Sequence, residues 1–214
     1  MANVKLITGP TDDEVLLSTV KARLDVPHDE HDVMLQEMIS GAVEFVQEMT
    51  GRVLLDSTWT WYLDRFTSAR PNSDEFWFSP TPIAVPGTVG LQLPIAPISA
   101  VDSVKYIDGD GVLQTLASSD WAADIITEPG RLYPSKTAVT WPSIGDYPNA
   151  VQVTLSAGYA DTDAIPARLR LGVMSLIGHY YENREAYIDS PFDLRTVPDG
   201  LRSVIHQYRL SWFV

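Results

Sequence analysis

The first fifty residues place apolar side chains at the three- and four-residue steps of amphipathic helices. Residues 11–14, Thr-Asp-Asp-Glu, have the form of a capping box and predict a first helix that ends before Pro27. A second helix is predicted from about Glu30 to Thr50, and Gly51 is suited to end it because glycine readily adopts the left-handed conformation. The apolar positions of this second helix are Leu35, Met38, Ile39, Ala42, Val46 and Met49.

From Val53 onward, apolar and polar residues alternate as in a β-strand, most clearly around Trp59 and Trp61. Residues 108–111, Asp-Gly-Asp-Gly, predict a hairpin turn because glycine accepts the positive φ that such turns require. Short strands separated by proline and glycine are typical of a small sandwich or barrel. The further predicted strands are residues 90–93, 99–107, 112–116, 121–126, 131–133, 138–141 and 151–157.

Helical spacing returns after Pro166 and again after Pro198. We therefore predict an α+β fold in which the N- and C-terminal segments form a helical bundle and a small antiparallel β sandwich or barrel-like module is inserted between them. The predicted boundaries are residues 1–52 for the N-terminal helices, 53–160 for the β-rich module and 161–214 for the C-terminal helices and tail.

The charge of the chain narrows the classes of function. Its 28 acidic and 15 basic residues give a formal net charge of -13, which repels a phosphate backbone, so sequence-specific DNA binding is not expected. The chain has no cysteine, which excludes disulfides and cysteine-ligated metals. No basic segment precedes an apolar stretch at the start, and no apolar run reaches the roughly 20 residues of a membrane span, so no membrane association is expected.

Two groups of polar residues have the composition of chemical sites. His28 and His31 have the spacing of a metal-binding pair, but further ligands are not identifiable, and a solvated first helical turn is the favoured interpretation. Residues 179–185, His-Tyr-Tyr-Glu-Asn-Arg-Glu, are interpreted as the end of an amphipathic helix rather than part of an active site. Nucleophile-elbow and phosphate-loop motifs are missing from the sequence, so we predict no catalytic, cofactor-binding or metal-binding residues and no enzymatic activity.

Tryptophans in the β-rich middle offer an alternative function, a β-rich module that binds a small ligand or a carbohydrate. Alternating tryptophans on a strand belong more often to a core than to a sugar platform, so this alternative is the weaker one. The residues concerned are Trp59, Trp61, Trp121 and Trp141.

A series of short motifs occurs in a fixed order along nearly the whole chain. These motifs are residues 41–46 (GAVEFV), 50–54 (TGRVL), 58–61 (TWTW), 93–98 (LPIAPI), 101–106, 108–111, 141–142, 157–159 (AGY), 165–166, 179–185 and 197–198, followed by a short helix that ends in Tyr208-Arg209. In their order and spacing together, they resemble the head-tail connector or adaptor family of tailed bacteriophages and gene transfer agents.

The resemblance implies a non-catalytic structural subunit of the virion neck. It implies a ring, typically of twelve copies, that lies beneath the portal protein, extends the channel through which DNA leaves, and provides the attachment platform for the tail. The expected partners are other copies of this chain, the portal protein, and neck or tail proteins such as a stopper or tail terminator. Such a subunit needs no cofactor, lets DNA pass without sequence-specific binding, and occurs in the host cytoplasm during assembly.

Acidic side chains form a stripe on the second predicted helix. At about 100° per residue, Glu30, Glu37, Glu44 and Glu48 fall within roughly 40° of one another, opposite the apolar face. The stripe is either an ordinary solvated face, which we favour, or a lining of the DNA channel. In a ring, symmetry would repeat it as a continuous negative annulus.

A proline-rich stretch from Pro71 to Gly90 extends a loop that is usually shorter in the family. It contains Phe76, Trp77 and Phe78, and an exposed apolar patch of this kind often marks a contact. We therefore predict that these three residues touch a neighbouring subunit or another tail component.

The C-terminal residues are apolar for a chain end. Tyr208, Trp212, Phe213 and Val214 either fold back on the helices or dock into a hydrophobic groove of the portal, where buried aromatic side chains act as anchors.

Overall fold

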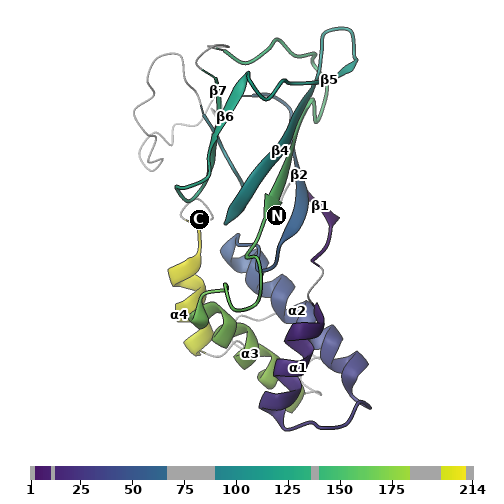
Figure 1. Ribbon diagram of the computed structural model, residues 1–214, viewed down its shortest axis with the longest axis vertical. Helices are drawn as coiled ribbons and strands as arrows, with labels where there is room; N and C mark the ends of the chain where they lie inside the picture. Colours follow the sequence, from purple (N-terminus) through teal and green to yellow (C-terminus); the bar gives the residue numbers. More distant parts are fainter. Residues whose placement is uncertain (1–2, 11–12, 67–89, 136–139, 184–198, 211–214) are drawn as a thin grey trace. The chain divides into compact units, whose positions relative to one another are not determined.

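The computed structural model describes residues 3–10, 13–66, 90–135, 140–183 and 199–210. The chain forms two compact units (Figure 1). The β unit comprises Met1–Thr8 and Ser57–Ala157, and the helical unit comprises Gly9–Asp56 and Gly158–Val214. With its helices and antiparallel sheets, the structure confirms the predicted α+β class.

The described part of the helical unit contains α1 (Asp13–Leu24), α2 (Asp32–Thr50), α3 (Ala167–Glu182) and α4 (Asp199–Tyr208). Helix α2 contacts each of the other three, and the amphipathic pattern explains why: its predicted apolar positions are buried or partly buried. The core that the helices enclose includes Val20, Leu35, Ile39, Ala42, Val46, Leu54, Leu169, Val173, Leu176, Ile177, Leu201 and Ile205.

The helix ends follow local backbone chemistry. Gly51 has φ 72° and donates its amide to the carbonyl of Gln47, so it ends α2 as predicted. Helix α3 ends at Glu182, within the segment 179–185 that was interpreted as a helix end, because Asn183 leaves helical geometry and its side-chain amide donates to the His179 carbonyl at 3.0 Å. Side chains of α4 pack closely against α3 at Gly172, where a Cβ would lie 2.8 Å from the Leu201 side chain.

Within the described β unit the strands form two antiparallel sheets. One has five strands in the order β1-β2-β8-β4-β5, and the other has three in the order β3-β7-β6. The bounds are β1 Val4–Thr8, β2 Ser57–Leu63, β3 Leu91–Gln92, β4 Ile98–Ile107, β5 Leu113–Thr115, β6 Trp121–Asp124, β7 Arg131–Pro134 and β8 Val151–Ala157. Alternate residues of β8 are buried, so this central strand fixes the inner face of the larger sheet.

Two features of the β unit differ from prediction. Strand β1 was not predicted; it pairs with β2, with Val4 opposite Trp61. Of the predicted strand 138–141, the described residues Thr140 and Trp141 are not in a strand, and the Trp141 ring instead stacks on Phe66 at 4.6 Å. Neither sheet closes into a barrel within the described residues. No described helix is both long and apolar enough to cross a lipid bilayer.

Candidate functional site: surfaces and junctions of the two units

The acidic stripe lies on the exposed side of α2. Glu37, Glu44 and Glu48 are exposed, and within the described residues none of the three forms an ion pair. Glu30 is also exposed but lies in the turn before α2, because the helix begins at Asp32 and not at Glu30 as predicted. Three carboxylates therefore share one helix face, and the fourth stands at its entrance.

The entrance to α2 is held by a lysine on α1. The Nζ atom of Lys21 lies 2.6 Å from an Asp29 carboxylate oxygen and 2.7 Å from one of Asp32. Two hydrogen bonds raise the pKa of the Lys21 amine: first the one to Asp29 and then the one to Asp32. The bond between Lys21 and Asp29 also lowers the pKa of the Asp29 carboxyl group. Asp32 also places negative charge in the first turn of α2, where the helix dipole favours it.

His28 and His31 lie beside this entrance with ring centroids 4.7 Å apart. The His31 Nδ1 atom is 3.2 Å from the hydroxyl of Tyr181 on α3. Among the residues that the structure describes, no group of three or more His, Asp or Glu side chains is placed to hold a metal ion. The described contacts of His31 therefore join α2 to α3.

The C-terminal end of α4 is bonded to the C-terminal end of α2. The Nε atom of Arg52 donates to the Tyr208 carbonyl at 2.7 Å, and its guanidinium lies 5.7 Å from the centre of the Tyr208 ring. The Leu210 amide donates to the Thr50 carbonyl at 3.0 Å, and Leu210 is buried. We call this set of contacts, formed by Thr50, Arg52, Tyr208 and Leu210, the C-terminal clamp.

The C-terminal clamp was not predicted from sequence, although Arg52 and Tyr208 both lie in motifs of the predicted family. It holds the chain as far as Leu210 against the end of α2. Of the predicted contact residues, only Tyr208 is described, and it is half-buried in the clamp. Phe76, Trp77, Phe78, Trp212, Phe213 and Val214 lie outside the described residues.

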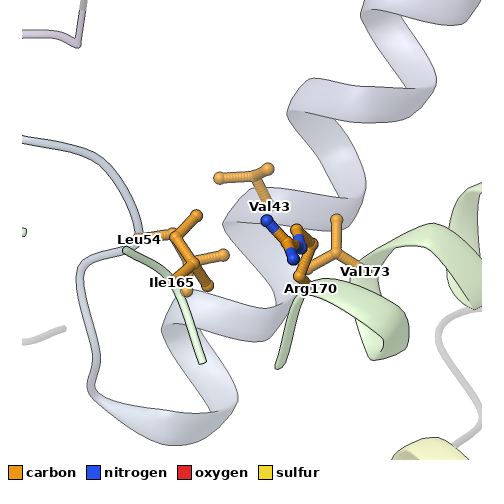
Figure 2. A pocket seen from close by; sticks show the side chains of 5 residues that line it. All are labelled: Val43, Leu54, Ile165, Arg170 and Val173. Carbon is orange, nitrogen blue, oxygen red and sulfur yellow. The ribbon is translucent and has the colours of Figure 1, made fainter. Parts of the chain in front are cut away.

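A small pocket lies between α2 and α3. Figure 2 shows aliphatic side chains around it, together with Arg170, and the lining residues are Val43, Leu54, Ile165, Arg170 and Val173. Its volume of about 10 Å³ is roughly that of one water molecule. The pocket is therefore a packing gap between helices and has no room for a substrate.

None of the four tryptophans considered for ligand binding is fully exposed; Trp59, Trp61, Trp121 and Trp141 are all half-buried. The Trp59 indole N–H donates to the Ser57 hydroxyl at 2.9 Å within its own strand. Half-buried rings of this kind contribute packing to the β unit.

Comparison with known proteins shows where this fold occurs. Residues 14–85, which include α1, α2 and β2, match the model of the phage gp6-like head-tail connector protein family. No curated protein sequence matches the chain. The match confirms the predicted resemblance to head-tail connectors.

Three solved structures share the fold over nearly the whole chain. A chain in the virion of a native gene transfer agent (GTA) particle is 21% identical, with 98% of this chain and 95% of that chain covered and a TM-score of 0.69. A chain in the neck of an empty GTA particle, with C6 symmetry, is 18% identical at 96% and 94% coverage, with a TM-score of 0.69. A chain in the neck of a native GTA particle, with C12 symmetry, is 20% identical at 96% and 94% coverage, with a TM-score of 0.67.

Proposed function

We propose that this chain is a structural head-tail connector of a tailed phage or phage-like particle. The observation that carries the proposal is the match of residues 14–85 to the head-tail connector family, joined to a fold shared with neck chains over almost the full length. The chain would act in the virion neck, after assembly in the host cytoplasm, and would be non-catalytic.

The connector would be a ring of twelve copies beneath the portal protein. Support comes from the C12 symmetry of one of the similar neck structures and from the family resemblance. Its partners would be the portal on one side and a stopper or tail terminator on the other, with the DNA passing through the ring without sequence-specific contacts.

The C-terminal residues are proposed to anchor the chain to the portal. Because the Leu210 amide and side chain are part of the C-terminal clamp, a chain that ends after Leu210 keeps the clamp and loses only residues 211–214. We expect this truncated chain to fold like the full chain and to lose binding to purified portal, measured by co-sedimentation.

The matched control for the truncation is replacement of Ser211 alone by alanine, which leaves the three apolar residues in place. Full portal binding by the truncated chain would assign the portal contact to another surface. Failure of the intact chain to bind portal and to enter particles would contradict the connector function itself.

The acidic stripe on α2 is proposed to face either solvent or the DNA channel. The rate of DNA ejection from particles distinguishes these two arrangements. The double variant Glu37→Lys and Glu44→Lys reverses the charge of an exposed face without touching the core. If the stripe lines the channel, particles that carry this variant eject DNA more slowly, because each copy attracts the phosphate backbone.

A control variant, Glu182→Lys, makes a similar exposed change at the end of α3. Ejection kinetics equal to wild type in the double variant, in particles of normal yield, would leave the stripe as a solvated face.

A β-rich ligand-binding module remains the alternative function. A chain that binds a defined sugar and forms no ring would favour this alternative.

A further inference from the structure

The five-stranded sheet of the β unit ends in two strands that have a described neighbour on one side only. Strands β1 and β5 are these edges. Edge strands present backbone N–H and C=O groups that bind another strand unless proline, charge or a covering segment prevents it. Strand β1, Val4–Thr8, has one lysine and no proline, and β5, Leu113–Thr115, has neither.

The hydrogen-bond pattern shows which groups of β1 point away from the sheet. In an antiparallel pair, alternate residues bond to the partner strand. The Tyr62 amide donates to the Asn3 carbonyl at 2.8 Å, and the register continues unbroken to Leu6. The backbone N–H and C=O groups of Asn3 and Lys5 therefore point toward β2, whereas those of Val4 and Leu6 point away from the sheet.

The same reasoning applies to β5. The Leu116 amide donates to the Val104 carbonyl at 2.8 Å, and the register of β4 with β5 is regular from Thr115 to Leu113. The backbone N–H and C=O groups of Leu113 and Thr115 therefore point away from β4. Each edge presents two residues whose backbone groups face no partner strand among the described residues.

Exposed aliphatic side chains accompany both edges. Leu6 and Ile7 are 44% and 53% exposed, and Val112 and Leu113 are 53% and 49% exposed. An aliphatic surface beside unpaired backbone groups is what an added strand uses, since backbone bonds and side-chain burial then act together.

The two edges also carry opposite charges. Lys5 is exposed on β1, and Asp110 is exposed in the turn that leads to β5; neither forms an ion pair with a described residue. Asp108, in contrast, uses its carboxylate for bonds within its own turn. Because the chain has a net charge of -13, two copies repel each other at long range, so a contact that pairs a cation with an acid is favoured.

Every pairing in this sheet is antiparallel, so its first and fifth strands, β1 and β5, run in the same direction. We infer that β5 of one copy pairs in parallel with β1 of the next copy, so that the sheets of neighbouring subunits join head to tail. The inference rests on the proposed function and names the surface through which copies of the ring contact each other. A contact between two different surfaces of identical chains closes into a ring when the rotation between copies divides a full turn.

A second copy fits these edges better than an unrelated strand. A foreign peptide needs only one edge, whereas this chain presents two whose direction, aliphatic exposure and charge are complementary. In a parallel pair, Lys5 near the start of β1 lies toward the turn that contains Asp110, ahead of β5.

The experiment uses proline to block one edge at a time. The N–H groups of Leu6 and Leu113 face outward, so Leu6→Pro and Leu113→Pro remove no hydrogen bond within the described sheet. At a concentration at which the wild-type chain is assembled, we expect each variant alone to shift toward monomer in analytical ultracentrifugation, with an unchanged circular dichroism spectrum. An equimolar mixture should form dimers and nothing larger, because one intact β1 and one intact β5 remain.

The matched control is Leu6→Thr, which keeps the outward N–H and places a β-branched side chain, of a kind that strands favour, at the same position. We expect Leu6→Thr to assemble, with a smaller rise in the dissociation constant than Leu6→Pro. For Leu6→Pro the expected rise is about tenfold per contact, because one hydrogen bond is lost.

A charge exchange tests the same contact without changing the backbone. Lys5→Asp and Asp110→Lys should each weaken assembly by a few-fold, about the effect of one exposed ion pair, and the double variant should recover it. Proline variants that form rings of wild-type size, or a mixture without dimers, would overturn the edge pairing while leaving the connector role intact. A wild-type chain that forms no oligomer, alone or on purified portal, would overturn both.

Discussion

The helical unit and the β unit differ in how they satisfy their backbone groups. In the helical unit, Gly51 donates to the Gln47 carbonyl and Leu210 donates to the Thr50 carbonyl, so the ends of α2 and α4 are bonded within the unit. In the β unit, the outer groups of β1 and β5 have no described strand beside them. A helix completes most of its hydrogen bonds within one segment, whereas a sheet edge is completed only by another strand.

The two units also expose different side chains. The helical unit presents carboxylates on α2, while the edges of the β unit present Leu6, Ile7, Val112 and Leu113. Carboxylates stay hydrated and repel DNA, whereas aliphatic side chains gain stability when they are covered. The β unit therefore carries the edges that we infer to join copies, whereas the acidic face of the helical unit carries the carboxylates that we propose to face water or DNA.

The largest effect is expected for Gly158→Ala, at the first residue of the helical unit after β8. Gly158 has φ +120°, and a Cβ there would overlap the backbone carbonyl of Leu55. We expect a loss of about 3 kcal/mol in the free energy of unfolding, measured by urea titration.

The control for this prediction is Gly41→Ala, on the exposed face of α2, where a Cβ meets no atom within 4 Å. Helix propensity should make this variant more stable by about 1 kcal/mol or less. Equal stability losses in the two variants would show that backbone conformation at Gly158 is not the cause.

A smaller effect is expected when the C-terminal clamp is broken. Arg52→Ala removes the bond to the Tyr208 carbonyl and the contact with its ring, so we expect a loss of about 1–2 kcal/mol in urea unfolding. Hydrogen exchange of the Leu210 amide should become faster in the same variant. Arg209→Ala, an exposed neighbour, should stay within about 0.5 kcal/mol of wild type, and a similar loss in both would argue against the clamp.

The smallest effect concerns the turn before β5. The hydrogen bond from the Gln114 side chain, and next the one from the Val112 amide, lower the pKa of Asp108. A lowered pKa means that the ionised carboxylate stabilises the turn above its unfolded pKa of about 3.9, and that this contribution is lost as the pH falls through the folded pKa.

We therefore expect the turn to be equally ordered between pH 7 and pH 5 and to loosen under acid conditions below about pH 4. Amide exchange of Val112 as a function of pH measures this, together with NMR titration of the Asp108 carboxyl group. Gln114→Ala removes the strongest donor and should bring the pKa of Asp108 closer to its ordinary value. An unchanged titration in that variant would contradict the assigned cause.

Much of the fold was predictable because the relevant signals are local. Each of these signals depends on residues within one element: the spacing of apolar residues along α2, the end of that helix at Gly51, and the alternation of buried residues along β8. The predicted start of α2 at Glu30 was wrong by two residues, since the bonds of Lys21 to Asp29 and Asp32 reach across from α1. Glu37, Glu44 and Glu48 are exposed on α2, and the place of the stripe on a solvated face or in a channel stays a proposal.

Local patterns of residues were enough to predict the α+β class, most strands and helices, and the resemblance to head-tail connectors, because periodicity and turn residues act over a few positions. The packing of distant segments established that Val4–Thr8 pairs with β2, that β1 and β5 are edges of the described sheet, and that Arg52 holds Tyr208 across 156 positions. Contacts between distant segments depend on which surfaces the packed core brings together, and no local pattern of residues records that choice.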